Sequence, residues 1–159
     1  MNRLPLFAVA MLACCPAAAQ TPPEHPDRAL STAAQLRVQL AQAKAENRPS
    51  DISTSKLVVS ANGLPVMLEY RAGDRQAEPA IHPTQAELIQ VIEGDCIFVL
   101  GGRPVGATVD KPGGSSTVGG TSIALHRGDN VFVPANIPHW FTHVHRLAML
   151  TLHIPVVPH

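Results

Sequence analysis

The sequence lacks an excess of charge of either sign, and charged residues are few. Its 12 basic and 12 acidic residues balance, and charged residues make up 15% of the 159 positions against 45% for hydrophobic residues. Nucleic acids and anionic membranes are bound through a basic face, which a balanced composition does not predict. We therefore expect one folded globular domain without a nucleic-acid partner.

The sequence also lacks an apolar run long enough to span a bilayer comfortably. The run at residues 4–15 follows a single basic residue, Arg3, and precedes the small residues 17–19. This is the pattern of a secretory signal peptide over residues 1–19, so we expect a periplasmic or secreted protein with no membrane partner after cleavage. A lipoprotein ranks below plain export, because Met11 starts a lipobox poorly.

Cysteine is scarce, and the mature chain is expected to contain no internal disulfide. Cys14 and Cys15 would leave with the signal peptide, so Cys96 would be the one remaining thiol. A lone cysteine in an apolar run is predicted to be a small buried side chain rather than a reactive thiol. The fold must then depend on its hydrophobic core.

Helical character is confined to the region before the main domain. Residues 30–46 contain neither glycine nor proline, and Leu36 and Leu40 recur at helical spacing. Ser31 is the expected N-cap of this helix. We expect residues 20–58 to form an extended tail followed by the helix.

Residues 59–159 alternate short apolar runs with turn signals, and the chain has 15 prolines, which favours an all-β sandwich or barrel over a helical bundle. Residues 101–120 are rich in glycine, so we expect a long surface loop or irregular hairpin there. The expected strands are 57–60, 65–71, 87–92, 96–100, 122–126, 131–134, 140–144 and 148–154.

Two histidine-bearing segments point to chemistry. The first is AIHPTQAELIQVIEGD, residues 80–95, in which four residues separate His82 from Glu87 and six separate Glu87 from Gly94. Neutral imidazole and carboxylate are ligands for Zn, Fe, Mn or Ni. A strand–turn–strand would place His82 and Glu87 on neighbouring positions of a barrel wall, where both are candidate metal ligands.

The second segment is GDNVFVPANIPHWFTHVH, residues 128–145. His139 follows shortly after Pro134 and can approach the first segment from a facing strand. His143 has the same strand parity as His139, because side chains repeat faces every second residue. We therefore expect His143 to be either a replacement ligand or proton shuttle inside the barrel, or a residue at its rim.

Together the two segments resemble the cupin family over roughly residues 60–155. That family's first motif is His-x-His, three or four residues, Glu, six residues and Gly; its second is Gly, five residues, Pro-x-Gly, two residues, His, three residues and Asn. Here Ala80 stands in the first histidine slot, His143 stands in the asparagine slot, and Asn136 replaces a glycine, a mild change because Asn tolerates positive φ. The resemblance implies a cupin-type antiparallel β-barrel, or jelly roll, over residues 59–159.

The resemblance implies a ligand set of His82, Glu87 and His139, with His143 as a fourth candidate. Two imidazoles and a carboxylate leave coordination positions open, as in the facial triad of non-haem iron oxygenases. We expect a divalent metal, Fe(II) or Mn(II) ahead of Zn or Ni, and dioxygenase-type or lyase-type chemistry on a small organic substrate.

Other interpretations stay open, because one fold serves many functions. The chain is alternatively a non-catalytic cupin that binds a small polar ligand without metal, or an inert metal-bound domain that forms a homodimer. His153 lies in the last expected strand, and the sequence does not fix which face it takes. Tyr70 or Arg71, if turned inward from an early strand, would orient an anionic substrate.

Overall fold

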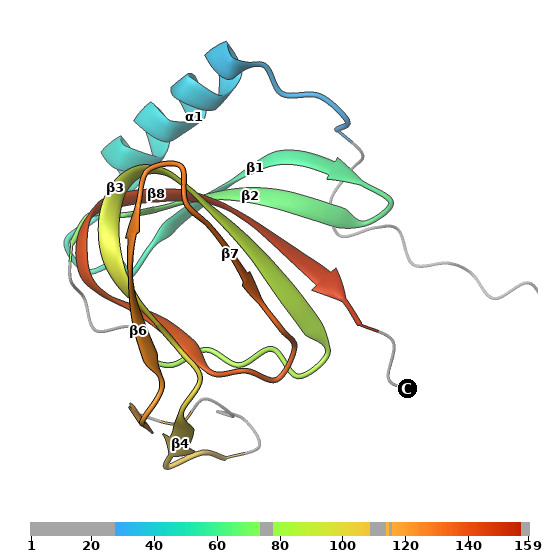
Figure 1. Cartoon of the computed structure of the whole chain (residues 1–159). Helices are drawn as coiled ribbons and strands as arrows, with labels where there is room; N and C mark the ends of the chain where they lie inside the picture. Colours follow the sequence, from blue (N-terminus) through green and yellow to red (C-terminus); the bar gives the residue numbers. More distant parts are fainter. Residues whose placement is uncertain (1–27, 74–77, 109–113, 115, 157–159) are drawn as a thin grey trace, which may run out of the picture.

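The computed structural model describes residues 28–73, 78–108, 114 and 116–156, so the expected signal peptide at 1–19 lies outside the described residues. In chain order (Figure 1) the described elements are α1 (Ala33–Glu46), β1 (Thr54–Ala61), β2 (Leu64–Arg71), β3 (Gln85–Leu100), β4 (Arg103–Val105), β5 (Ser116–Val118), β6 (Thr121–His126), β7 (Asn130–Val133) and β8 (His139–Pro155). In this part of the chain, no helix has the length and apolar character needed to cross a membrane.

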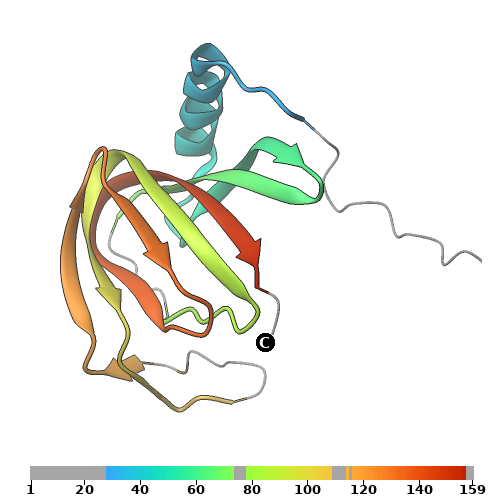
Figure 2. The ribbon, with the colours of Figure 1, turned by 45° about the vertical axis from the view of Figure 1, so that its right-hand side comes forward.

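The main sheet is antiparallel and has six strands in the order β1-β2-β8-β3-β6, with β7 also paired to β3. It curls into a barrel, as the two views in Figures 1 and 2 show. Within the glycine-rich segment 101–120, β4 and β5 form a small separate hairpin. The expected all-β antiparallel barrel with an N-terminal helix is confirmed, and β1 already starts at Thr54, inside the segment 20–58.

Two long strands replace four of the expected short ones. The runs 87–92 and 96–100 belong to β3, and the runs 140–144 and 148–154 belong to β8. The break expected between the strands 87–92 and 96–100 is wrong, because β3 passes through register shifts at Glu93–Asp95 while it stays paired with β8. Gly94 has a φ of +76°, and a Cβ on it would lie 2.4 Å from the carbonyl oxygens of His145 and Arg146, so this bend requires glycine.

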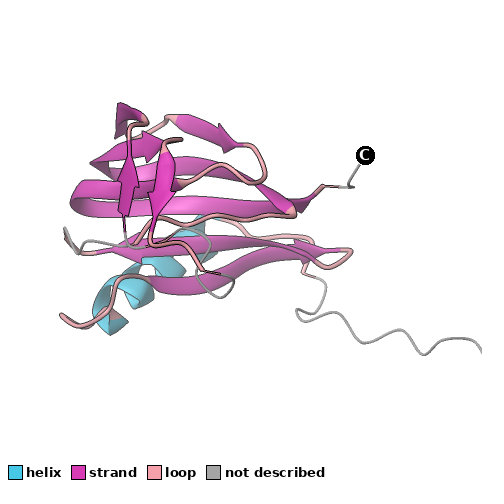
Figure 3. Ribbon diagram, turned by 90° about the horizontal axis from the view of Figure 1, so that it is seen from below, coloured by secondary structure: helices cyan, strands magenta, loops and turns pink. Residues whose placement is uncertain are grey.

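Helix α1 is capped by Thr32, not by Ser31. The Thr32 hydroxyl accepts a hydrogen bond from the Gln35 backbone N–H at 3.2 Å, and the Gln35 side-chain oxygen accepts one from the Thr32 N–H at 2.8 Å. This capping box needs Glu or Gln three residues after the cap, which Thr32 has and Ser31 lacks. The helix lies outside the strands, against one side of the sheet (Figure 3).

Two hydrophobic clusters hold the fold together, one inside the barrel and one beneath α1. The cluster beneath α1 centres on Ala43 of the helix with Leu68 and Tyr70 of β2. Cys96 is buried inside the barrel, as expected, and burial raises the pKa of its thiol to about 11, which makes it unreactive. The inner cluster contains Ile89, Val91, Cys96, Phe98, Leu125, Val133, Phe141, Val144, Leu147 and Met149.

Candidate metal centre

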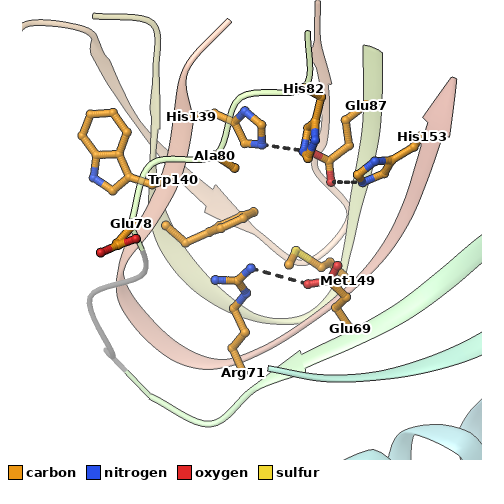
Figure 4. Close-up of a pocket in the computed structure, with 11 residues that line it drawn as sticks. Glu69, Arg71, Glu78, Ala80, His82, Glu87, His139, Trp140, Met149 and His153 are labelled. Atoms are coloured by element: carbon orange, nitrogen blue, oxygen red, sulfur yellow. Dashed lines mark hydrogen bonds and ion pairs between the residues drawn. The ribbon is translucent and has the colours of Figure 1, made fainter. Parts of the chain in front are cut away.

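Three imidazoles surround one carboxylate at one end of the barrel (Figure 4). Glu87, near the start of β3, lies opposite His153 of β8 in the sheet register. Glu87 Oε2 is 3.0 Å from His139 Nε2 and 3.7 Å from His82 Nε2, and Glu87 Oε1 is 3.4 Å from His153 Nε2. These four side chains, contributed by segments far apart in the sequence, form the candidate centre.

Backbone hydrogen bonds join the two histidine segments. Ala80 and His139 form an isolated antiparallel bridge, with N···O distances of 2.8 and 3.0 Å. The Asn136 N–H donates to the carbonyl of His82 at 2.9 Å. Asn136 has a φ of +65°, the left-handed conformation that glycine or asparagine adopts most easily. The turn before His139 thus holds the loop that carries His82.

Two of the imidazoles are oriented by hydrogen bonds on the side away from Glu87. His139 Nδ1 lies 3.2 Å from the carbonyl oxygen of Ile137, and because a carbonyl only accepts, this nitrogen carries the proton. His153 Nδ1 lies 3.4 Å from the side-chain oxygen of Gln85. Nε2 of each ring is therefore turned toward the carboxylate, in the arrangement that positions histidine ligands in metal sites.

Burial and the imidazoles act in opposite directions on Glu87, whose carboxyl is buried. Burial favours the neutral acid, but the hydrogen bonds from His139 and His153 outweigh it and hold the pKa of Glu87 at about 2. The hydrogen bond to Glu87 raises the pKa of His153, whereas burial and the neighbouring His153 lower the pKa of His82. At neutral pH Glu87 is therefore ionised and His82 is neutral, the forms in which both bind metals.

The donor atoms are spaced like ligands of a single ion. Two ligands that each lie about 2.1 Å from an ion, at tetrahedral or octahedral angles, stand about 3.0 to 3.4 Å apart. The distances from Glu87 to the imidazole nitrogens span 3.0 to 3.7 Å. Donor atoms of His82, Glu87 and His153 all lie within 4.8 Å of one another, and His139 is not part of that group. Imidazole nitrogen and carboxylate oxygen suit Fe, Mn, Zn and Ni. The residues present therefore fit a divalent metal.

The structure does not bring His143 to the other three candidate ligands, which do converge. His143 is exposed, with a φ of +51°, and its Nδ1 contacts the hydroxyl of Thr142 at 3.1 Å. Strand β8 is irregular at this point, because Phe141 and Val144 are both buried although they differ in parity. The alternation that would place His143 on the same face as His139 is interrupted, so the His143 side chain is exposed to solvent instead.

The sequence does not fix which face of the last strand His153 takes, and the structure turns it toward Glu87. Beyond the irregular part of β8, Met149 and His153 both line the pocket next to the site, so they share one face. His153 thus supplies a third imidazole although position 80 is alanine. The sequence did not show which residues of β8 face the pocket. The register shifts between the two halves of β8 interrupt the alternation of side chains, so a local pattern cannot predict it.

A small pocket adjoins the imidazoles, with a cavity volume of about 170 Å³. Its volume is below the roughly 300–1,000 Å³ of pockets for drug-sized ligands, so it suits a small molecule. Arg71 lines this pocket, whereas Tyr70 is buried in the cluster beneath α1, with Lys44 5.9 Å from its ring centre. The lining residues are Glu69, Arg71, Glu78, Ala80, His82, Glu87, His139, Trp140, Phe141, Met149 and His153.

Comparison with protein-family models finds no match, and comparison with curated proteins finds none either. Solved structures do match. KdgF from Halomonas sp. is 14% identical with a TM-score of 0.52, over 70% of this chain and 87% of that one. A cupin superfamily protein from Desulfitobacterium hafniense is 16% identical with a TM-score of 0.50, over 70% and 84%.

A third match is to a structure of Fe(II) HppE, which is 17% identical with a TM-score of 0.50 over 69% of this chain and 54% of that one. At such low identities the likeness concerns the fold and leaves the chemistry open. The antiparallel barrel, the matched structures and the two histidine segments agree with one another. The chain therefore has the fold of the cupin superfamily.

Proposed function

We propose that this protein is an exported cupin that binds a divalent metal through His82, Glu87, His139 and His153 and acts on a small organic substrate. The observation that carries the proposal is the convergence of His82, Glu87 and His153, whose donor atoms all lie within 4.8 Å of one another. His139 Nε2 lies 3.0 Å from the same carboxylate, and its Nδ1 contacts a backbone carbonyl on the other side of the ring. The apolar run after Arg3 supports export.

When bound, a divalent ion would supply a Lewis acid with coordination positions left open for substrate or dioxygen. This donor set suits the dioxygenase-type or lyase-type chemistry that we expect, with Fe(II) or Mn(II) ahead of Zn or Ni. The chain itself orients the ligands through the Ile137 carbonyl and Gln85. Trp140, Phe141 and Met149 give the pocket an apolar wall that would exclude water from a bound substrate.

A second candidate function is supported by the same cluster. In a metal-free cupin, protons on His139 and His153 would serve as the cations, and both rings would donate hydrogen bonds to Glu87. The raised pKa of His153 and the lowered pKa of Glu87 agree with this state. The barrel would then bind a small polar ligand without performing chemistry on it.

Metal analysis of untagged protein by inductively coupled plasma mass spectrometry separates the two candidates. We expect about one divalent ion per chain, and at least tenfold weaker binding in His153→Ala, since disturbing even an outer-shell partner of a metal ligand costs about 10–100-fold. His145→Ala is the matched control, because His145 is exposed and pairs with Asp95 at 2.9 Å, outside the pocket.

A metal content well below one equivalent, unchanged in His153→Ala, would favour the metal-free binder. If metal is bound, oxygen uptake that depends on an added substrate, or release of a cleaved product, distinguishes an enzyme from an inert metal-bound domain.

A further inference from the structure

Arg71 lies on the pocket wall, away from the metal ligands (Figure 4). It is the last residue of β2, and 15% of its side chain is exposed. Its guanidinium carbon is 4.6 Å from the centre of the Phe141 ring, a cation–π contact, and its Nη2 is 3.5 Å from Glu69 Oε2. These two contacts hold a positive charge against the pocket.

Among the described residues, the contact with Glu69 leaves most of the hydrogen-bonding capacity of Arg71 unused. A guanidinium has five N–H donors, and this single contact is at the outer limit of a hydrogen bond. Arg71 Nε is buried and has no hydrogen-bond partner among the described residues. The exposed part of the side chain, 15%, is where an acceptor from outside the chain can reach the guanidinium.

We propose that the pocket takes a small organic carboxylate, whose carboxylate group pairs with Arg71 while its other end reaches the His82–Glu87 cluster. This substrate class rests on the proposed metal-dependent function. The N–H groups of a guanidinium match the two oxygens of a carboxylate as parallel hydrogen bonds. The apolar side chains of Phe141 and Met149 would cover the carbon chain between the two ends.

The dimensions of the pocket restrict the ligand further. In the sheet register Glu69 lies opposite Met149, and Glu87 lies opposite His153. Met149 and His153 are four residues apart on β8, which corresponds to about 13 Å along a strand. The long side chain of Arg71 takes up part of that span, and the volume of about 170 Å³ limits the remainder. An extended acid of a few carbons fits better than a single-carbon ion or a sugar chain.

The position of Arg71 on the pocket wall agrees with an anionic ligand. Arg71 and Glu69 neutralise each other, and a divalent ion beside Glu87 would leave one positive charge next to the imidazoles. Glu78 also lines the pocket and brings one negative charge, so the wall would be neutral as a whole, with Arg71 as the arginine that an anion would meet. A carboxylate would accept hydrogen bonds from the exposed donors of Arg71, whereas a neutral ligand without an acceptor at that end would not.

Titration calorimetry of the full chain with succinate, glutarate and adipate, with and without one equivalent of Mn(II), tests this proposal. We expect at least one diacid to bind, and its diamide to bind at least about tenfold more weakly. Arg71→Gln should weaken the diacid about 10–100-fold without changing Mn(II) content. Arg71→Lys keeps the charge but not the planar donor set, so its loss should be smaller. Arg127→Gln, a change at an exposed arginine, is the matched control.

Thermal unfolding of each variant establishes that it is folded. The double variant Glu69→Gln/Arg71→Gln removes both charges of the ion pair, so the net charge of the pair does not change. Equal diacid binding by the parent chain and a folded Arg71→Gln variant would overturn the proposal, as would no binding of any diacid to the parent chain. Failure of the metal centre gives a different result: no Mn(II) uptake in any variant, with Arg71-dependent diacid binding still present in metal-free protein.

Discussion

At the residue scale, the site shows how a barrel with the cupin fold brings three imidazoles to one carboxylate without a histidine at position 80. Ala80 lines the pocket and forms a backbone bridge with His139, so its Cβ lies within the site. His153, which lies opposite Glu87 on the neighbouring strand β8, places its Nε2 3.4 Å from the Glu87 carboxylate. The donor set is therefore built from a different strand, while Glu87 keeps its central position.

Restoring the missing histidine should compensate for the loss of His153. We expect His153→Ala to lose metal, and the double variant Ala80→His/His153→Ala to regain at least part of the affinity, because position 80 lies two residues before His82 and lines the same pocket. Competition with a fluorescent chelator measures the metal affinity of each protein. Ala80→Ser/His153→Ala is the control, and equal affinities in the two double variants would show that position 80 does not face the ion.

At the element scale, the site depends on the bend that β3 and β8 share. The two strands stay paired from Gln85 opposite Pro155 to Leu100 opposite His139, with register shifts in between. Because of the bend, the same pair of strands holds Glu87 near one end and His139, opposite Leu100, at the other end. Both residues therefore reach the same site. Gly94 permits the bend, because the backbone of β8 occupies the space where a side chain would begin.

Alanine substitution at two glycines separates the effect of backbone conformation from that of crowding. Gly94 and Gly63 have nearly equal φ values, +76° and +74°, but nothing lies within 4 Å of a Cβ placed on Gly63. Gly63→Ala should cost about 1–2 kcal/mol, the cost of a left-handed conformation for an L-residue. Gly94→Ala should cost more than about 3 kcal/mol, since backbone must move. Urea denaturation measures both free energies of unfolding, and equal losses would contradict the crowding at Gly94.

At the scale of the whole molecule, folding carries an ionised carboxylate into the barrel, which links stability to pH. The pKa of Glu87 is about 2 in the folded protein against an ordinary value of 4.5. A carboxyl with a lowered folded pKa stabilises the fold fully above its unfolded pKa, and this contribution is lost as the pH falls toward the folded pKa.

The metal-free protein should therefore lose part of its stability between about pH 5 and pH 2 through Glu87 alone. The lowered pKa corresponds to a contribution on the order of 3 kcal/mol at neutral pH. Glu87→Gln should lack this contribution, so the difference in unfolding free energy between parent and variant should shrink as the pH is lowered. Urea denaturation in the presence of a chelator at several pH values measures it, and parallel pH profiles would contradict the assigned pKa.

The sequence by itself determined what depends on local pattern: the series of strands, the helix before them, and the spacing that joins His82 to Glu87. Tertiary structure alone decided that His143 faces away, that His153 faces inward, and that Arg71 rather than its neighbour lines the pocket. For the two histidines the physical reason is that side chains alternate along a strand only while its register is unbroken. For Arg71 it is that the packing of β2 against α1 and the barrel decides which face of β2 meets the pocket. Each irregularity in β8 exchanges the two faces, and the long-range pairing with β3 sets where those irregularities lie.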